Sequence, residues 1–297
     1  MTNVDFFLPA IAGCFGAVIG SFLNVVIYRL PRESMTISKP TRSFCPSCGH
    51  SITWYENVPI ISYLVLGGRC RACRQVISWR YPVVEGLCLL LFMALTFHEF
   101  DGLVTGGPQQ IQLIAVYLCH LVLVMVALVV TFIDLEFQII PNEINYGGVV
   151  IALILSPILP LLHSHESLFS SLQGTMPAWS ASLVTALVGA VVGASALLLV
   201  GIVGKWIFKK DAMGLGDVKF MAFMGAVFGW GGALTIFLLG CLVGAVVGLG
   251  YKLATRNQEI PFGPFLSVGM LVFMFFREEV YHFMFQTWPG WINSALL

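Results

Sequence analysis

The stretch IQLIAVYLCHLVLVMVALVVTFI, residues 111–133, contains no Asp, Glu, Lys or Arg. The hydrocarbon core of a bilayer is about 30 Å thick, and about 20 apolar residues are enough to cross it as an α-helix. This stretch therefore predicts a membrane-spanning helix, and it sets the class of the whole fold.

The composition of the chain agrees with this assignment. Of the 297 residues, 58% are hydrophobic and 10% are charged, and the mean hydropathy is +0.90. A soluble domain carries about 25% charged residues. The formal net charge is zero, so the overall charge does not favour a nucleic-acid partner. We expect an all-α polytopic membrane protein.

Further apolar runs lie on both sides of this stretch. We predict eight spans, at 6–28, 83–98, 111–133, 144–162, 181–204, 218–230, 233–251 and 260–276. The sixth is short, and the turn GWGG (229–232) separates it from the seventh. Glycines four residues apart, such as Gly189 and Gly193, indicate that the helices pack closely.

The basic residues indicate the orientation. Most of them lie between the first two spans, around the connection of the fifth and sixth spans, or after the seventh. Basic residues favour the cytoplasmic side. Eight spans with the N-terminus outside place all of these groups there, and leave only Arg277 on the other side. No basic residue precedes the first apolar run, and Arg29 follows it, so we expect an anchor rather than a cleaved signal peptide.

Residues 29–81 differ from the rest, being polar, basic and rich in turn residues. A segment of this length builds little hydrophobic core, so a metal or disulfide staple is expected. We therefore divide the chain into a first transmembrane helix (1–28), a cytoplasmic module (29–81) and a membrane core (82–297). We find no convincing internal repeat.

Four cysteines in this module form two C-x2-C pairs. They lie in CPSCGH (45–50) and CRACRQ (70–75), with 21 residues between the pairs. Four thiolates match the tetrahedral ligand set that Zn2+ prefers. Disulfides are disfavoured in the cytoplasm. We predict a structural zinc site in a zinc-ribbon-like insertion, with ligands Cys45, Cys48, Cys70 and Cys73. The alternative is a set of reduced or redox-active cysteines.

Aromatic residues flank these cysteines. Trp54, Tyr55, Trp79 and Tyr81 suit a module that rests at the membrane interface. Glu85 lies just inside the second predicted span. It faces a cavity near the cytoplasmic interface, or it stays among the lipid headgroups, and the sequence leaves both possibilities open.

Two aspartates lie at the cytoplasmic border of predicted spans. Asp134 ends the third span, and Asp217 begins the sixth in GLGDVKF (214–220). A carboxylate at this depth is costly and indicates a function. Two carboxylates that share a site hold one proton between them, so that one accepts a proton from water while the other donates a hydrogen bond. This is the chemistry of aspartic proteases.

The residues around Asp217 fit this hypothesis. Gly214 and Gly216 would permit unusual backbone angles and let a peptide approach closely. Lys219 would mark the cytoplasmic border. A structural interpretation stays open, in which Asp217 caps the sixth helix and Asp134 is an interfacial residue near a helix end. A proton or ion pathway would use the same two carboxylates.

With these motifs, the chain resembles the type IV prepilin leader peptidases along nearly its whole length. Besides the paired cysteines, the likeness rests on GCFGAVIGSFLNVVIYRLPRES (13–34), WYENVPIISYL (54–64), RYPVVE (80–85), IDLEFQIIPN (133–142), GLGDVKF (214–220) and PFGPFL (261–266). The resemblance implies that Asp134 and Asp217 are catalytic, the second within a GxGD motif. Related GxGD intramembrane proteases lack the cysteine module and fit less well.

The resemblance also implies an activity. Such an enzyme of the bacterial inner membrane removes the basic leader from prepilins or type II secretion pseudopilins at the cytoplasmic border. Many members then methylate the new N-terminus with S-adenosylmethionine. The chain has no Rossmann-type glycine fingerprint, so a methyl-donor site would be unusual and would involve the 29–81 module. Basic leaders would favour acidic groups nearby, for which the candidates are Glu33, Glu56, Glu85, Glu136, Glu143 and Asp211.

One position departs from the family, because Asn142 stands where many members carry an acidic residue. This weakens a role for a third carboxylate. Two other functions remain as alternatives. A polytopic transporter with a zinc-stapled loop would show unwound mid-span segments or an inverted repeat. An assembly scaffold would use the cysteine module to dock a partner.

Overall fold

The computed structural model describes residues 3–32, 36–38, 42–100, 104, 107, 109–209, 213–254 and 260–282. Within these ranges the fold is all-helical, as the composition predicts, and the strand pairing is limited to two isolated bridges. The chain divides into two compact units, Met1–Pro141 and Asn142–Leu297.

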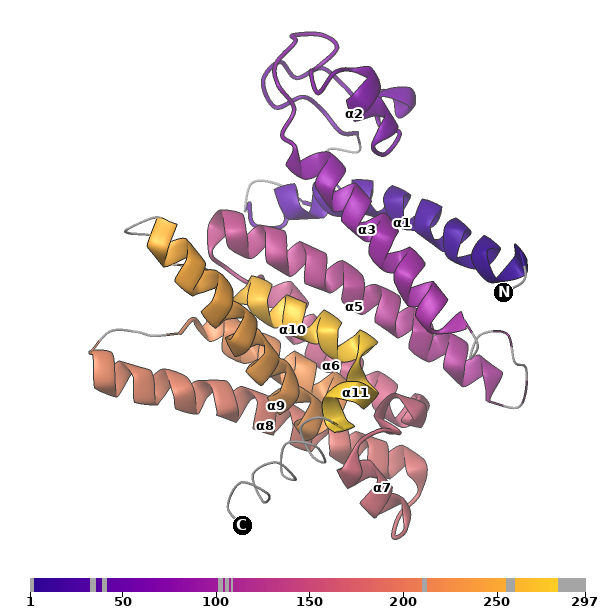
Figure 1. Ribbon diagram of the computed structural model, residues 1–297, viewed down its shortest axis with the longest axis vertical. Coiled ribbons are helices and arrows are strands. Elements are labelled where there is room, and N and C mark those ends of the chain that lie inside the picture. The colour runs from indigo at the N-terminus through magenta and orange to yellow at the C-terminus, as the bar shows by residue number, and fades with distance from the viewer. Residues whose placement is uncertain are drawn as a thin grey trace. The chain divides into compact units, whose positions relative to one another are not determined.

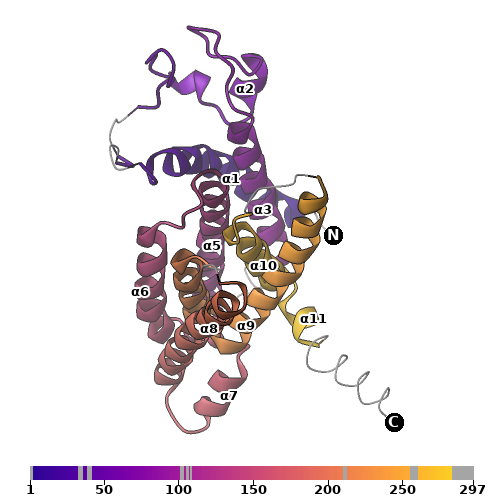
Figure 2. The same cartoon turned by 90° about the vertical axis from the view of Figure 1, so that its left-hand side faces the viewer.

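The first unit combines three long helices with the cysteine-containing module (Figures 1 and 2). Its elements are α1 (Asn3–Arg29), η1 (Trp54–Glu56), α2 (Ile61–Val65), α3 (Arg80–His98) and α5 (Gln110–Phe137). The helices α1, α3 and α5 pack on one another. The module runs from the end of α1 to the start of α3, so both helices hold it in place.

Close approach of two backbones joins α1 to α3. A Cβ atom at Gly16 would lie 2.7 Å from the carbonyl oxygen of Cys88, and one at Gly20 would lie 2.7 Å from Cα of Glu85. Any larger residue would push the two helices apart. This packing holds Glu85 beside α1, near the module.

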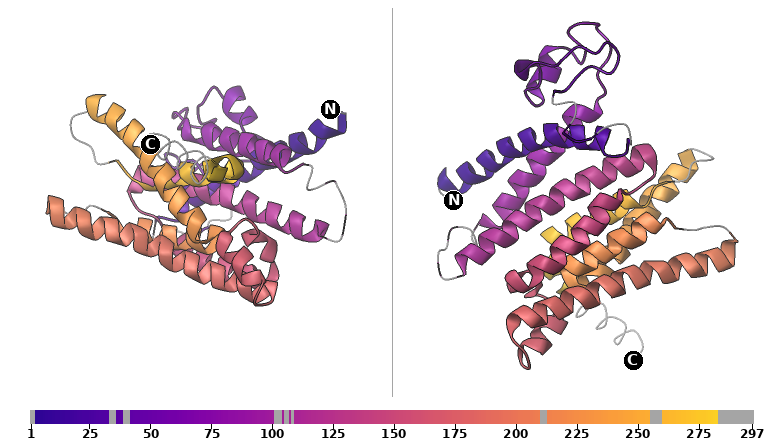
Figure 3. Two further views of the ribbon diagram at one scale, coloured as in Figure 1. Left: turned by 60° about the horizontal axis from the view of Figure 1, so that its bottom comes forward. Right: turned by 180° about the vertical axis from the view of Figure 1, so that it is seen from behind.

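The second unit is a bundle around α9. Its elements are α6 (Asn142–Ile158), η2 (Pro160–His163), α7 (Ser167–Gln173), α8 (Ala178–Phe208), α9 (Leu215–Ala254), α10 (Gly263–Phe275) and α11 (Arg277–His282). The helices α6, α8 and α10 all pack against α9. Figure 3 shows α9 in orange beside α8 in salmon.

Glycines also bring α8 and α9 together, which confirms the predicted packing role of Gly189. A Cβ atom at Gly189 would lie 2.0 Å from the carbonyl oxygen of Gly225, and a Cβ atom at Gly225 would meet the carbonyl oxygen of Gly189 at 2.0 Å. Gly193 approaches Met221 in the same way, at 2.3 Å. The two helices therefore touch through their backbones.

The helix α9 breaks at one residue, Gly229, where φ is 74° and ψ is −176°. The buried Glu166 lies against the break, and its Oε1 accepts a hydrogen bond from the amide of Gly232 at 2.9 Å. Just before the break, Nε2 of His163 donates to the carbonyl of Ala226 at 3.2 Å. Side chains thus bond backbone groups around the break, which an apolar environment requires.

The number of long apolar helices is smaller than the number of predicted spans. Five described helices are long and apolar enough to cross a membrane: Phe6–Arg29, Arg80–His98, Gln110–Phe137, Ala178–Ile207 and Leu215–Gly250. Two shorter apolar helices are Asn142–Ile158 and Gly263–Phe275. The predicted sixth and seventh spans both lie in α9. The predicted turn at 229–232 is in fact a break at Gly229 alone, because helical geometry resumes directly after it.

The glycine contact between α8 and α9 predicts a difference between two Gly→Ala variants. Gly189→Ala should lower the free energy of unfolding by about 1–3 kcal/mol more than Gly147→Ala does, because its added methyl group overpacks the contact with Gly225. A Cβ atom at Gly147, in α6, meets nothing within 4 Å. Both variants gain the same helix propensity, so their difference isolates the contact. Thermal unfolding of the full chain in detergent measures it, and equal midpoints would contradict the packing.

Candidate functional site

The predicted site residues fall into two groups, one in each unit. Asp134 and the four module cysteines belong to the first unit. Gly214, Gly216, Asp217 and Lys219 belong to the second. Each group has its own local geometry.

The two C-x2-C pairs lie in two loops that share one backbone pattern. In each loop the first cysteine donates its amide hydrogen to the carbonyl five residues later, and its own carbonyl accepts from the amide four residues later. The donor–acceptor pairs are Cys45–His50 and Gly49–Cys45 in the first loop and Cys70–Gln75 and Arg74–Cys70 in the second, all at 2.8–2.9 Å. This short structural repeat was missed in the sequence because the two segments share little besides their cysteines.

The four thiols form one cluster. Their sulfur atoms all lie within 4.8 Å of one another, and the Sγ atoms of Cys45 and Cys73 are 3.9 Å apart. Tetrahedral zinc with bonds of 2.3 Å separates its sulfur ligands by about 3.8 Å. No disulfide joins the cysteines in the part of the chain described. The donor set therefore fits Zn2+, and four thiolates leave no open position for catalysis.

Two of these thiols favour the thiolate form that binds metal. Burial raises the pKa of Cys45, but the backbone N–H groups of Ser47 and Cys48 and neighbouring thiols outweigh it and bring the pKa to about 7. The backbone N–H of Cys73 lowers the pKa of Cys70 in the same way. Thiolates are the metal-binding form of cysteine, so the loops favour that form at Cys45 and Cys70. At Cys48 the backbone N–H of His50 lowers the pKa, but desolvation and the neighbouring thiols outweigh it and raise that pKa to about 11.

Glu56 connects the two cysteine loops. Its Oε2 accepts from the amide of Thr53 at 2.9 Å and from the Thr53 hydroxyl at 2.8 Å. Nε2 of His50, in the first loop, lies 3.4 Å from the same oxygen, and Nη1 of Arg71, in the second, lies 3.7 Å from Oε1. The hydrogen bonds from Thr53 lower the pKa of Glu56, because they favour the ionised carboxylate.

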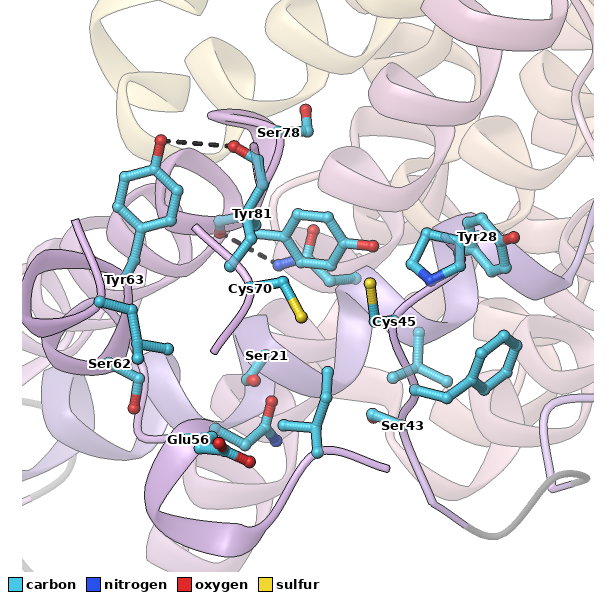
Figure 4. Close-up of a pocket in the computed structure, with 18 of the residues that line it drawn as sticks. Ser21, Tyr28, Ser43, Cys45, Glu56, Ser62, Tyr63, Cys70, Ser78 and Tyr81 are labelled. Carbon is cyan, nitrogen blue, oxygen red and sulfur yellow. Dashed lines mark hydrogen bonds between the residues drawn. The ribbon is translucent and has the colours of Figure 1, made fainter. Parts of the chain in front are cut away.

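A cavity of about 510 Å3 lies between the module and the ends of α1, α3 and α5 in the first unit. Figure 4 shows Tyr28, Cys45, Cys70 and Tyr81 around it. Glu85 also lines this cavity, and its Oε2 accepts from the amide of Ile60 at 2.7 Å. Of the two possibilities that the sequence left open for Glu85, the cavity is therefore confirmed.

The other acidic candidates lie in different surroundings. Glu56 and Glu136 line the same cavity, and Glu136 pairs with Arg80. Glu143 is exposed in the second unit. The candidates Glu33 and Asp211 lie outside the described residues.

Asp134 is buried in the last turn of α5, with 5% of its surface exposed. The helix ends at Phe137, and the amide of Gln138, at φ 55°, donates to the carbonyl of Asp134 at 2.9 Å. The C-terminal end of a helix carries partial negative charge, which disfavours a carboxylate there. The helix dipole therefore does not favour a charge on Asp134.

Asp217 lies in the opposite electrostatic setting. It is the third residue of α9, which begins at Leu215, so the helix dipole favours its charge. The interpretation of Asp217 as the N-cap is wrong by position, because Gly214 directly precedes the helix. A Cβ atom at Gly214 would lie 3.2 Å from Oδ2 of Asp217. Neither Gly214 nor Gly216 has a positive φ. Gly214 therefore leaves space beside the carboxylate of Asp217.

Asparagines at the start of α6 hold the start of α9. Nζ of Lys219 donates to Oδ1 of Asn142 at 2.8 Å and lies 4.9 Å from the ring centre of Tyr146. The buried Asn145 donates from Nδ2 to the carbonyl of Gly216 at 3.3 Å. Asn142 thus positions Lys219 without a carboxylate. Asn145 was missed in the sequence, although a polar side chain within an apolar run was the available signal.

Comparison with protein families matches both units. Residues 14–99 match the family described as Bacterial Peptidase A24 N-terminal domain. Residues 121–249 match the Type IV leader peptidase family. The first match contains the cysteine module, and the second contains Asp134 and Asp217. No solved structure matches the chain.

Curated relatives match nearly the whole chain. Proteins named Prepilin leader peptidase/N-methyltransferase are similar to it in several bacteria. The protein of Aeromonas salmonicida (strain A449) is 34% identical, covering 92% of this chain and 92% of its own length. That of Aeromonas hydrophila is 35% identical, covering 90% of each chain. That of Pseudomonas putida is 33% identical, covering 91% of each chain.

The thiol cluster predicts the metal content of the purified protein. We expect about one zinc ion per chain, and substantially less in Cys45→Ser or Cys70→Ser, because each removes one of four ligands. Cys119→Ser is the matched control, since this cysteine lies in α5, outside the cluster. Elemental analysis measures the content, and the same content in all four proteins would reject the site.

The hydrogen bonds to the Glu56 carboxylate predict that the stability of the fold depends on pH. Because the folded state lowers its pKa below the ordinary 4.5, its stabilisation is present above that value and is lost as the pH falls through the folded pKa. Glu56→Gln should therefore be less stable than the natural chain at neutral pH, and the gap should shrink towards about pH 4 and below. Unfolding followed by tryptophan fluorescence measures the gap, and a gap independent of pH would contradict this role.

Proposed function

Because the chain belongs to the type IV leader peptidase family, we propose that it removes the basic leader from type IV prepilins or type II secretion pseudopilins. The match of the chain to relatives of that name over some 90% of both lengths carries this proposal. The names of these relatives also include N-methyltransferase. We propose the same second activity for this chain, with S-adenosylmethionine as the methyl donor.

The peptidase chemistry is assigned to Asp134 and Asp217. Asp134 is buried in the last turn of α5, where the helix dipole does not favour a carboxylate, so the dipole gives no structural reason for this residue. In the second unit, Lys219, two residues after Asp217, donates a hydrogen bond to the side chain of Asn142.

The proposed reaction needs one ionised and one protonated carboxyl group. The ionised group takes a proton from water, and the water oxygen attacks the carbonyl carbon of the scissile peptide bond. The protonated group donates a hydrogen bond to the carbonyl oxygen, where negative charge develops. The C–N bond then breaks, and the leaving amine takes the proton that the first carboxyl group accepted from water, which restores that group to its ionised form. Gly214 would leave room for the substrate beside Asp217.

The helix lengths support a particular membrane arrangement. The 40 residues of α9 correspond to about 60 Å of helix at 1.5 Å per residue, twice the hydrocarbon thickness. We therefore propose that the two halves of α9, before and after Gly229, cross separately. Together with α1, α3, α5, α6, α8 and α10 they would make eight crossings.

In this arrangement, residues 29–81 form a cytoplasmic zinc module and 82–297 the peptidase core. The protein would lie in the bacterial inner membrane. Its aspartates would act on the cytoplasmic side, where a prepilin leader joins its apolar helix.

A transporter is the second candidate, because the break at Gly229 resembles the interrupted helices of such proteins. The break is limited to one residue, and Glu166 bonds the amide of Gly232 beside it. A cavity beside it, lined by Glu166, Phe228 and Phe273, has a volume of only about 10 Å3. The family and the two carboxylates favour the peptidase.

Replacing either aspartate tests its proposed role in peptide cleavage. Asp134→Asn and Asp217→Asn, made separately, should each slow leader removal by about 100-fold or more, because each removes one partner of acid–base catalysis. The assay is the gel shift of a prepilin incubated with purified protein in detergent. Asp101→Asn is a chemically matched control, which the predicted topology places on the opposite side of the membrane. Full processing of the prepilin by either of these two variants would contradict the proposal.

A further inference from the structure

One carboxylate ties the last turn of α5 to both neighbouring helices of the first unit. Glu136 lies in that turn, two residues after Asp134. Its Oε2 accepts a hydrogen bond from Nη1 of Arg80, the first residue of α3. Its Oε1 lies 3.7 Å from Nη2 of Arg32, three residues after the end of α1. Glu136 therefore joins three helix ends, which lie close together in Figure 1.

Arg32 makes a second contact with the same turn. Its guanidinium carbon lies 3.9 Å from the ring centre of Tyr28 in α1 and 5.0 Å from that of Phe137, the last residue of α5. A guanidinium group is attracted to an aromatic ring, and a cation is also favoured at the C-terminal end of a helix. Arg32 therefore stabilises the end of α5 through a ring, an ion pair and the helix dipole.

The ion pair between Glu136 and Arg80 is partly withdrawn from solvent. The side chain of Arg80 is 14% exposed and that of Glu136 is 39% exposed. Water and salt screen such a pair less than a fully exposed one. The planar guanidinium group also restricts the directions in which a carboxylate can bind. The pair therefore favours one arrangement of the end of α5 against the start of α3.

These contacts bear on whether Glu136 attracts a basic leader, for which it is one of the acidic candidates. Each of its two carboxylate oxygens already faces a guanidinium group. A basic side chain of a leader would have to displace one of these groups. Two guanidinium groups and one carboxylate also leave a net positive charge, which repels a basic peptide. The contacts therefore favour a role within the protein over a role in leader binding.

The position of Asp134 depends on the turn that Glu136 holds. Residues two apart in an α-helix point about 200° apart, so the two carboxylates leave the helix on nearly opposite sides. A carboxyl group in acid–base catalysis must lie within hydrogen-bond reach of the reacting atoms. A displacement of about 1 Å can slow a reaction by about 100-fold. Contacts that fix the end of α5 therefore matter for any chemistry at Asp134.

We propose that Glu136 is a positioning residue for the peptidase reaction, and that its ion pairs with Arg80 and Arg32 hold the turn that carries Asp134. The inference rests on the proposed function, because it takes Asp134 as one of the two catalytic carboxyl groups. Glu136 does not touch the substrate in this role. It acts through the backbone of α5.

The steady-state kinetics of prepilin cleavage by the full chain in detergent test this role. Glu136→Gln should lower kcat by about tenfold and leave KM within about twofold, because it displaces Asp134 without removing a contact with the leader. Glu99→Gln is the matched control. The carboxylate of Glu99 pairs with Nδ1 of His120 at 2.5 Å, so it also joins α3 to α5, but from the other end of α3. This variant should keep kcat and KM within about twofold of the natural values.

The two kinetic constants separate positioning from leader binding. A raised KM with an unchanged kcat in Glu136→Gln would make Glu136 a leader-binding group and would overturn the inference. Unchanged values of both constants would overturn it too, as would an equal fall in kcat for Glu99→Gln. Failure of the proposed function would instead show as full cleavage by Asp134→Asn or Asp217→Asn, whatever Glu136→Gln does.

A double variant tests whether Glu136 acts through Arg80. If the two residues act as a pair, Arg80→Gln and Glu136→Gln should each lower kcat by about tenfold, and together by much less than about 100-fold. A full product of the two single effects would show that they act independently, and it would contradict the proposed pair.

Conservative replacement of Arg80 keeps the test valid if Glu136→Gln does not fold. Arg80→Lys retains a cation opposite Glu136, whereas Arg80→Gln removes the ion pair. We expect kcat to fall by about tenfold in Arg80→Gln and by no more than about threefold in Arg80→Lys, with KM unchanged in both. A natural kcat in Arg80→Gln would overturn the positioning role.

Discussion

A backbone amide or carbonyl within lipid has no water to bond, and the rest of this structure depends on that constraint. It explains why the described chain is helical from end to end outside the small module. It also explains the surroundings of the one interruption in α9. At Gly229 the helical pattern fails, and Glu166 and His163 bond the neighbouring backbone groups. A residue with a side chain at this position would both strain the backbone and meet Glu166 at 2.6 Å.

The module between α1 and α3 contains little regular helix, and hydrogen-bonded loops give it its structure. It has too few residues for a large core, and its two cysteine loops repeat one hydrogen-bonding pattern so that four sulfur atoms converge. Glu56 then links the loops through His50 and Arg71. The module is held to the helices by the Glu85 contact with Ile60, and the close approach at Gly20 positions Glu85. Helix packing and the shape of the cavity are therefore coupled.

The two aspartates illustrate how differently one residue type can be placed. Asp217 lies at the favourable end of a helix dipole, so the fold tolerates its charge without any catalytic benefit. Asp134 is buried near the unfavourable end of another helix. The helix dipole therefore accounts for a charge at Asp217 but not for one at Asp134.

The sequence by itself determined the helical class, the positions of most apolar helices and the set of four cysteines that forms the thiol cluster. These follow from local patterns: runs of apolar residues long enough for a bilayer, and two C-x2-C pairs. The same patterns misjudged 229–232, because they do not show that Glu166 supports a break of one residue within a single helix. Only the tertiary structure decided which polar groups share the cavity. Asn24 and Tyr81 are 57 residues apart in the chain, and their hydrogen bond exists only because α1 packs against α3.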